Sequence, residues 1–279
     1  MLGCSSARLA FPDNAHANAR LANIRLHPIK SLDPVHVKQS RVGPGGGLEF
    51  DRAWALYSAD GQWVNGKRTA AIHLIRAAYA PDTSSVTLSV PDDSRKIPTK
   101  TFTFPSDVAA ASQWFSGFFE QSITVRHSPE GFPDDTIANG PTIVSTATLQ
   151  AVSELFEGMD VDEVRCRFRT TLEIDGVPAF WEDQLFGEEE RSSVRFRIGE
   201  VNFEGSNPCA RCPVPPRNPR TGEIIPGFQK RFSDFRRSNI PSWTPEARFD
   251  HYYRLATNTR VASAESGKIL RVGDSLALH

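Results

Sequence analysis

The feature that most constrains this chain is a pair of cysteines placed directly before a proline-rich stretch. A strand-like segment leads into the run Asn207-Pro208-Cys209-Ala210-Arg211-Cys212, and Pro213-Val214-Pro215-Pro216 follows it. Because proline has no N–H to donate to a central ladder, sheet pairing should end here and leave backbone free to approach a ligand. We interpret the run as a cofactor loop. Taken alone, however, a C-x-x-C pair is equally typical of half a zinc site, a redox dithiol or two incidental cysteines.

Cysteine usage and charge narrow the functional classes. Four cysteines in 279 residues are too few for a disulfide framework, which favours a reducing compartment and thiolate chemistry. Lys and Arg (32) nearly balance Asp and Glu (33), so no long-range field indicates nucleic acid or an anionic membrane as the main partner. No run reaches the roughly 18 apolar residues of a membrane span. We therefore expect a cytoplasmic protein with no nucleic-acid partner and no membrane span, and a disordered lead-in over residues 1–19.

Short strands separated by turn signals predict an all-β element in the first half of the chain. Alternating apolar and polar residues predict a first strand over 21–25 and a second over 48–56, the latter after a glycine-rich tract. The Asp60-Gly61 pair predicts a hairpin that joins residues 54–58 to 63–65. Further strands are predicted over 74–79, 86–90 and 101–104.

Two polar sites lie beside these strands. Lys30 and Ser31 follow the first strand within His27-Pro28-Ile29-Lys30-Ser31, where both can reach an anion from the rim of a sheet. The alternative is a solvated lysine in a turn. Arg52 follows Asp51, and an ion pair on a strand would explain this pair equally well.

The periodicity changes at residue 107. Val108, Ala111 and Phe118 recur at helical intervals behind Asp107, a residue suited to capping, which predicts a helix over 107–120. A strand is predicted over 122–127. Residues 128–140 are rich in Pro, Asp and Gly and are predicted to form a linker or a loop over the site. We place a domain boundary between residues 128 and 129.

The second half begins with a predicted strand over 141–144. It runs into Ser145-Thr146-Ala147-Thr148, whose hydroxyls can cap a helix that carries Leu149 and Val152. Such a helix start can also bind an anion, with ordinary capping as the alternative. Strands over 194–198 and 201–203 lead to the cysteines. Residues 228–253 are rich in aromatic and basic side chains but show no period that we can assign.

Three arginines alternate along Arg165-Cys166-Arg167-Phe168-Arg169. We predict a strand here, so that the three guanidinium groups share one face and the remaining two side chains share the other. Three neighbouring cations repel one another unless an anion lies among them, and the guanidinium fork suits phosphate. A solvated edge strand is the alternative.

Together these stretches resemble the MOSC domain family, which is named after molybdenum cofactor sulfurases and includes the mitochondrial amidoxime-reducing components. The segments that carry the resemblance are 165–172, Phe180-Trp181-Glu182-Asp183, 198–203, 208–212, Asn218-Pro219-Arg220-Thr221-Gly222 and the ending over 267–278. Pro28-Ile29-Lys30-Ser31 and Asp51-Arg52-Ala53-Trp54 resemble the β-barrel domain that precedes MOSC domains. The implied fold is α+β and mostly β: an N-terminal β-barrel-like domain over 20–128, then a MOSC β-barrel domain over 129–279 with a few peripheral helices.

The resemblance also assigns roles to residues. It implies that Cys212 is the protein ligand to molybdenum, and we add Arg211 to the cofactor site because a neighbouring cation would help to keep the Cys212 thiolate ionised. It implies contacts to the pterin phosphate or its surroundings from Lys30, Ser31, Arg52, Ser145 and Arg169. The family's Arg-Pro-Asn motif reads Arg169-Thr170-Thr171 here, so the Thr171 hydroxyl replaces an amide. Asp183 is a candidate proton donor or supporting group.

The implied activity is reduction of small N-hydroxylated compounds, such as amidoximes or hydroxylamines, by the molybdenum cofactor. Electrons would come from a separate protein of the cytochrome b5, flavin reductase or ferredoxin type, because the sequence lacks a second cysteine cluster for its own iron–sulfur centre. One alternative is a carrier that holds the cofactor, or a persulfide on Cys212, without turnover. Another is a zinc or dithiol module, for which only Cys166, His127 and His251 could join the cysteine pair.

Overall fold

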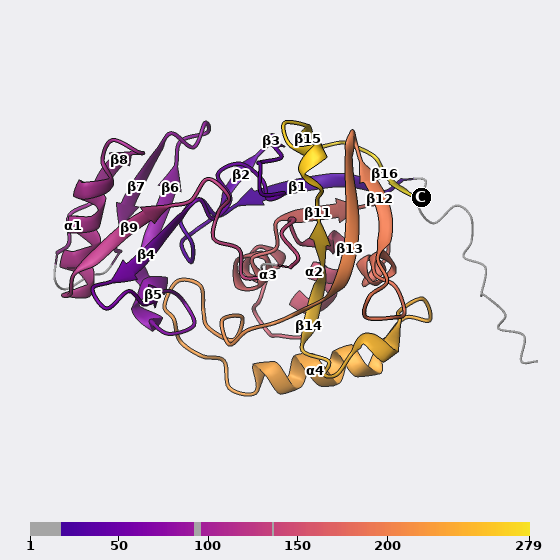
Figure 1. The fold of residues 1–279 in the computed structure, drawn as a ribbon. Coiled ribbons are helices and arrows are strands. Elements are labelled where there is room, and N and C mark those ends of the chain that lie inside the picture. Colours follow the sequence, from indigo (N-terminus) through magenta and orange to yellow (C-terminus); the bar gives the residue numbers. More distant parts are fainter. Residues whose placement is uncertain (1–17, 92–95, 136) are drawn as a thin grey trace, which may run out of the picture.

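A computed structural model of the chain describes residues 18–91, 96–135 and 137–279 (Figure 1). The lead-in predicted over residues 1–19 therefore falls almost wholly outside the described residues. Strands predominate over helices in the part described, which confirms a mostly β, α+β fold. No helix in those three ranges is both long and apolar enough to cross a lipid bilayer.

The largest element is an eight-stranded sheet built mainly from the second half of the chain. Most neighbouring strands are antiparallel, but β10 and β11 run parallel. In spatial order the strands are β16 (Leu276–Leu278), β12 (Val194–Ile198), β13 (Val201–Ala210), β14 (Arg254–Arg260), β10 (Ile143–Ser145), β11 (Leu172–Asp175), β1 (Arg20–Leu26) and β2 (Val35–Val37).

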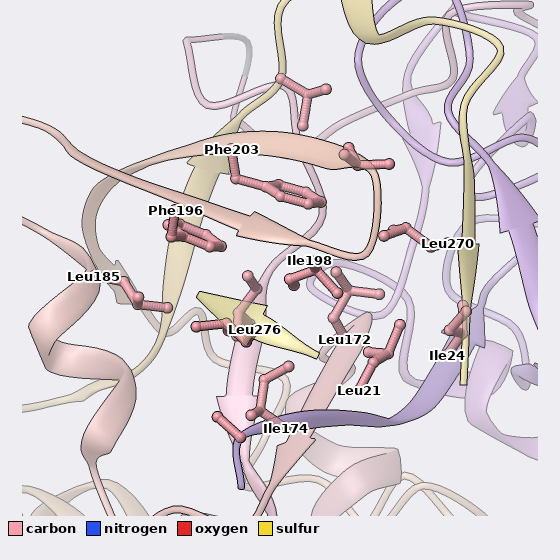
Figure 2. Close-up of a cluster of buried hydrophobic side chains, with 14 of the residues drawn as sticks. Leu21, Ile24, Leu172, Ile174, Leu185, Phe196, Ile198, Phe203, Leu270 and Leu276 are labelled. Carbon is pink, nitrogen blue, oxygen red and sulfur yellow. The ribbon is translucent and has the colours of Figure 1, made fainter. Parts of the chain in front are cut away.

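This sheet curves into a barrel-like shape. Leu276 N donates to Ala19 O at 2.9 Å, and Leu21 N donates to Asp274 O at 2.8 Å, so the start of β1 meets the strand at the opposite end of the order. Apolar side chains fill the interior, among them the stacked rings of Phe196 and Phe203, whose centroids lie 5.3 Å apart (Figure 2). These hydrogen bonds pair backbone at the edge of β16 that would otherwise be open.

The first half adds a smaller β unit beside the barrel (Figure 1). Its aromatic core includes Trp114, Phe115 and Phe118 from the helix predicted over 107–120, and the 54–58 with 63–65 hairpin is confirmed. The unit contains the sheet β5-β4-β9, the sheet β6-β7-β8 and one helix: β4 (Trp54–Ser58), β5 (Trp63–Val64), β6 (Arg76–Tyr79), β7 (Ser85–Ser89), β8 (Lys100–Thr103), α1 (Val108–Phe119) and β9 (Ile123–His127).

The strand predicted over 48–56 begins only at Trp54. Phe50 and Arg52 have φ values of 67° and 53°, which lie in the left-handed region and cannot continue a strand. The Asp51 carboxylate accepts the His27 N–H at 2.8 Å and fixes this turn against the end of β1. Apolar alternation predicted a strand, but the turn is held by contacts that are distant in sequence.

Strands from the first half of the chain pair with strands from the second half. β1 is hydrogen-bonded to β11, and β3 (Gln39–Arg41) pairs with β15 (Ile269–Arg271). The division between residues 128 and 129 stays a prediction, and these pairings show that secondary structure crosses it. The short 3₁₀ helices are η1 (Ala70–Leu74), η2 (Trp181–Leu185), η3 (Glu246–Arg248) and η4 (Ser263–Glu265).

The strand predicted through the alternating arginines is wrong, because this segment forms helix α3 (Val161–Phe168). Asp160 caps the helix by accepting the Glu163 N–H at 2.7 Å. Arg167 pairs with Glu163 one turn earlier, a spacing that stabilises helices. Val164 and Phe168 bury one face in the core, so capping and a helical apolar stripe outweigh the local alternation.

Two more helices complete the fold. Helix α2 (Thr146–Ser153) begins as predicted at Ser145, whose hydroxyl accepts the Thr148 N–H at 3.0 Å. Helix α4 (Phe228–Ser238) lies in the stretch that the sequence left unassigned and runs along the lower side of the barrel (Figure 1). Its Phe228 and Phe232 pack on Phe168.

A buried ion pair fastens α4 to the barrel. The Arg236 guanidinium, which is 1% exposed, donates to the Asp183 carboxylate of η2 and lies 4.0 Å over the Phe180 ring. Thr244 Oγ1 donates to the same carboxylate at 2.7 Å. Because both charges are removed from water, each depends on the other for compensation.

We therefore predict that Arg236→Met lowers the free energy of unfolding by about 3 kcal/mol, since it leaves the Asp183 carboxylate buried without its cation. The neighbouring exposed residue provides the matched control, because Arg237→Met should change stability by no more than about 0.5 kcal/mol. Urea unfolding followed by tryptophan fluorescence measures both. Equal midpoints for the two variants would contradict the structural role of the pair.

Candidate functional site

A pocket of about 490 Å³ brings together residues that lie far apart in the sequence. It opens beside the barrel, between the smaller β unit and the cysteine loop. Six of the nine residues predicted for the site line this pocket. Each lies close to the end of a strand or helix. Those six are Lys30, Ser31, Arg52, Arg169, Arg211 and Cys212.

Lys30 is held at the pocket wall by backbone and side-chain contacts. Its N–H donates to Trp54 O at 2.8 Å, which ties the end of β1 to the start of β4. Its ammonium group donates to Phe132 O at 2.8 Å, pairs with Asp134 at 3.0 Å and lies 4.3 Å over the Trp63 ring. Burial lowers the pKa of Lys30, and Asp134 partly opposes that shift. The lysine is thus preorganised, with an acidic loop residue as its present partner.

Arg52 and Arg169 form the cationic centre of the pocket. Both have a φ of 53°, and Arg169 occupies the left-handed position that ends α3. Arg52 donates to the neighbouring Asp51 carboxylate and, at 3.5 Å, to Arg169 O. Arg169 donates to Leu32 O at 2.7 Å, and no carboxylate of the described residues forms an ion pair with it. Burial, and then the nearby Arg52, lowers the pKa of Arg169 to about 10, and Asp33 partly opposes that shift.

The cysteine loop is fixed by two arginines. Strand β13 continues through Pro208 and ends at Ala210, with register shifts that accommodate the proline, so pairing ends within the motif as the prolines predicted. Arg211 N donates to Tyr253 O at 3.0 Å, and its Nη1 donates to Cys209 Sγ at 3.1 Å. Arg167 holds the stretch that follows the cysteines by donating to Pro215 O at 2.9 Å. Cys209 and Cys212 are half-buried free thiols that line the pocket.

Only part of the predicted arginine face exists. Arg165 pairs with Glu173 and Asp162 away from the pocket, because helical geometry turns it to a different side. Arg167 pairs with Glu163 and donates to the backbone carbonyl of Pro215. Of the three guanidinium groups, Arg169 alone remains without a carboxylate partner among the residues described.

Three predicted residues do not line the pocket. Ser145 is fully buried as the cap of α2, and Asp183 is enclosed beneath α4 by its pairing with Arg236. Thr171 is 1% exposed, and its Oγ1 has no hydrogen-bond partner, although its N–H donates to Thr142 Oγ1 of the pocket wall at 3.1 Å. Their contact with a ligand stays a prediction, and the structure gives each of them a role in holding the surrounding backbone.

The structure adds pocket residues that the sequence did not single out. His73 of η1 is buried, and its Nε2 has no partner. Burial, and then Arg169, lowers the pKa of His73 to about 4, so the ring is neutral at physiological pH. The loop over 130–135, predicted as a linker or a loop over the site, does line the pocket and brings Asp134. No local pattern marks His73, because only the packing of η1 against the cysteine loop places it here.

The zinc hypothesis finds no support in the part of the chain described. No three His, Cys, Asp or Glu side chains gather there in a group that could hold a metal ion. His127 instead lies against the Trp54 ring, with centroids 4.4 Å apart. The two cysteines therefore do not belong to a described tetrahedral site of protein ligands.

Comparison with known protein families gives a match for each half of the chain. Residues 18–122 match the MOSC N-terminal beta barrel domain, and residues 141–277 match the MOSC domain. Curated relatives include proteins named molybdenum cofactor sulfurase from Drosophila erecta (27% identical over 234 residues), Drosophila melanogaster (26% over 234) and Drosophila persimilis (24% over 245). Each match covers 74% of this chain but only 29 to 30% of the relative, so the chain spans less than a third of their length.

The Glu182-Asp183 pair is buried rather than a surface turn. Glu182 is 0% exposed, and its Oε2 accepts Ser145 N at 3.2 Å and Thr148 Oγ1 at 3.0 Å. Burial, followed by the Asp183 carboxylate, raises the pKa of Glu182 from 4.5 to about 7. The folded protein thus keeps a proton that the unfolded chain releases at lower pH.

This difference predicts a specific pH dependence of stability. Between pH 4.5 and 7 the unfolded state has lost the Glu182 proton and the folded state retains it, so the free energy of unfolding falls as pH rises. Glu182→Gln removes that titration. Relative to wild type, its free energy of unfolding should therefore rise by about 3 kcal/mol as the pH is raised from 4.5 to 7.5. Urea unfolding across this range, with the exposed Glu188→Gln as control, measures the gain. Parallel curves for Glu182→Gln and wild type would show that Glu182 does not hold the proton.

Proposed function

This chain belongs to the MOSC family, and from that premise we propose that it binds a molybdenum–pterin cofactor and reduces small N-hydroxylated compounds with it. The observation that carries the proposal is the convergence of Lys30, Arg52, Arg169 and Cys212 on one pocket. They come from four separate segments of the chain, so they can meet only if the whole fold is formed. Cations at one part of a pocket and a thiol at another suit a ligand with an anionic end and a soft metal end.

The cationic part fits a phosphate. A dianion loses much hydration free energy on burial unless charged donors replace the water. Arg169, which lacks a carboxylate partner among the described residues, supplies such donors, and Arg52 and Lys30 are within the same pocket. The Ser31 hydroxyl and the neutral His73 ring, whose Nε2 is unpartnered, add uncharged hydrogen-bonding groups. The volume of about 490 Å³ lies within the range usual for cofactor and ligand sites.

The cysteine loop fits a soft metal. Thiolate is the side-chain donor that such metals prefer, and Cys212 lines the pocket at the end of a strand fixed by Arg167 and Arg211. A bound molybdenum cofactor would supply two-electron abstraction of oxygen from an N–OH group. The protein's part is to hold the phosphate at Lys30 and Arg169, to fix the thiol, and to exclude water with the loop over 130–135.

The electrons are proposed to come from a separate protein of the cytochrome b5, flavin reductase or ferredoxin type. The three cysteines within the described ranges are Cys166, Cys209 and Cys212, and no metal-binding group of three acidic, His or Cys side chains includes them. An electron carrier of the chain's own is therefore not supported by those residues.

A second candidate function is a carrier of the cofactor or of a persulfide sulfur on Cys212. The relatives named molybdenum cofactor sulfurase favour it, because the matched region covers most of this chain. The second thiol favours it too, since Cys209 lies beside the Arg211 guanidinium at 3.1 Å and could accept or pass on sulfur.

Replacing Cys212 tests the metal site. Cys212→Ser, expressed in a host that makes the molybdenum cofactor, should lose molybdenum on purification and lose reduction of benzamidoxime by an artificial electron donor. Cys166→Ser, a change at the cysteine outside the pocket, should retain both. Molybdenum is measured by mass spectrometry and pterin by fluorescence after oxidation. Full activity in Cys212→Ser would end the assignment, whereas a metal-loaded wild type without reductase activity would favour the carrier function.

Replacing Arg169 tests the phosphate end. Arg169→Ala removes a charged hydrogen-bond donor and should lower pterin content, and affinity for inorganic phosphate, about tenfold or more. The control is Arg195→Ala, because the Arg195 side chain is 77% exposed and pairs with Glu204. Equilibrium dialysis with phosphate and pterin analysis of the purified proteins provide two independent readings. Unchanged values for Arg169→Ala would show that the anion binds elsewhere.

A further inference from the structure

Cys166 lies in a small recess next to the pocket, and the proposed cofactor chemistry does not use it. The recess has a volume of about 10 Å³ and shares Ser31, His73 and Arg169 with the pocket wall. Cys166 is half-buried and is not in a disulfide. A space of this size, about that of one water molecule, favours attack at the sulfur by a small oxidant over a bulky thiol.

A buried arginine with spare donors is aimed at this thiol. Arg25 of β1 is 4% exposed, and its Nη2 donates to Cys166 Sγ at 3.5 Å. The Nε and Nη1 of Arg25 have no hydrogen-bond partner, and no carboxylate of the described residues forms an ion pair with this side chain. A guanidinium in such surroundings is costly unless an anion lies against it, so the site favours added negative charge at the sulfur.

The walls of the recess add further positive charge. Arg76, Arg169 and Arg217 line it, and the single carboxylate there, Asp33, is paired with Arg76 at 3.2 Å. The Nε atoms of Arg76 and Arg217 are buried without partners, as is the Nε2 of His73. His73 is 7% exposed and lines the recess itself. Among the described residues, these donors surround a space lined by one acidic side chain, Asp33.

We propose that Cys166 is a peroxide-sensitive thiol whose oxidised form, a sulfenate anion, pairs with Arg25 and Arg169. The thiolate sulfur of Cys166 attacks one oxygen of hydrogen peroxide, so that an S–O bond forms and the O–O bond breaks. The departing hydroxide takes up the proton of the new S–OH group and leaves as water, so that the sulfenate anion remains. The sulfur is oxidised by two electrons and the peroxide is reduced by two electrons.

Oxidation of Cys166 should change anion binding in the pocket, because it alters the partner of Arg169. Cys166 of α3 and Arg169, the residue that ends this helix, both line the recess, so the two side chains lie close together. A sulfenate oxygen offers Arg169 the anionic partner that it lacks, in competition with a phosphate in the pocket. Oxidation of Cys166 should therefore weaken phosphate binding about tenfold, the size of one hydrogen bond to a charged group.

The test measures oxidation at one residue and does not depend on the cofactor. The full chain carrying Cys4→Ser, Cys209→Ser and Cys212→Ser, which leaves Cys166 as its one remaining cysteine, is treated with hydrogen peroxide. Catalase then removes the excess, and the protein is unfolded in dimedone so that a buried sulfenate can react. Peptide mass spectrometry should find the adduct on Cys166, and oxidised glutathione should give no mixed disulfide there.

Variants of Arg25 complete the test. Arg25→Met should slow the labelling of Cys166 about tenfold, and Arg25→Lys should restore part of the rate because the positive charge returns. Arg20→Met, a change to an exposed arginine on the same strand, should leave the rate unchanged. No adduct on Cys166, or equal rates in Arg25→Met and wild type, would overturn the proposal. Unchanged phosphate affinity after oxidation would overturn the link to Arg169.

Discussion

The structure of the site depends on positive charge that the protein does not neutralise by itself. Arg169 ends α3 in a left-handed conformation, which directs its guanidinium into a partly buried space beside Arg52. Among the described residues, its guanidinium donates to the backbone carbonyl of Leu32 and forms no ion pair with a carboxylate. Two cations held together away from water raise the free energy of the folded state, and an anionic ligand lowers it. The fold therefore carries a built-in preference for an anion at this place.

The antiparallel pairing of β1 with β11 explains how this charge is concentrated. The end of one strand and the start of its antiparallel neighbour lie at the same edge of a sheet. Lys30 follows β1 and Arg169 precedes β11, so the pairing brings two cations together that are far apart in the sequence. Hydrogen bonds from the start of β1 to residues 274–276 then make this strand part of the second half's framework. Any change that loosens β1 should disturb both halves of the site.

Buried polar groups around η2 support the opposite side of the barrel. Glu182 holds the start of α2 and the neighbouring Asp183 holds α4, so one short helix connects two peripheral helices to the core. Helix α4 in turn packs against Phe168, the residue before Arg169. This arrangement links the stretch over 228–253, whose sequence shows no clear period, to the position of the cationic centre. The acidic pair thus fixes two helices, one of which packs on the residue before Arg169.

The sequence by itself determined the β-rich class, the helix at 107–120 and the capping by Ser145, and it marked the cysteine loop as a candidate site, because turns, caps and prolines act over a few residues. Tertiary structure decided that Arg165 to Phe168 is helical, since the buried stripe of Val164 and Phe168 needs a core to pack against. It also decided that Lys30, Arg52 and Arg169 meet and that Asp183 does not join them. Those outcomes depend on strand pairing and burial between distant segments, which no local pattern of residues records.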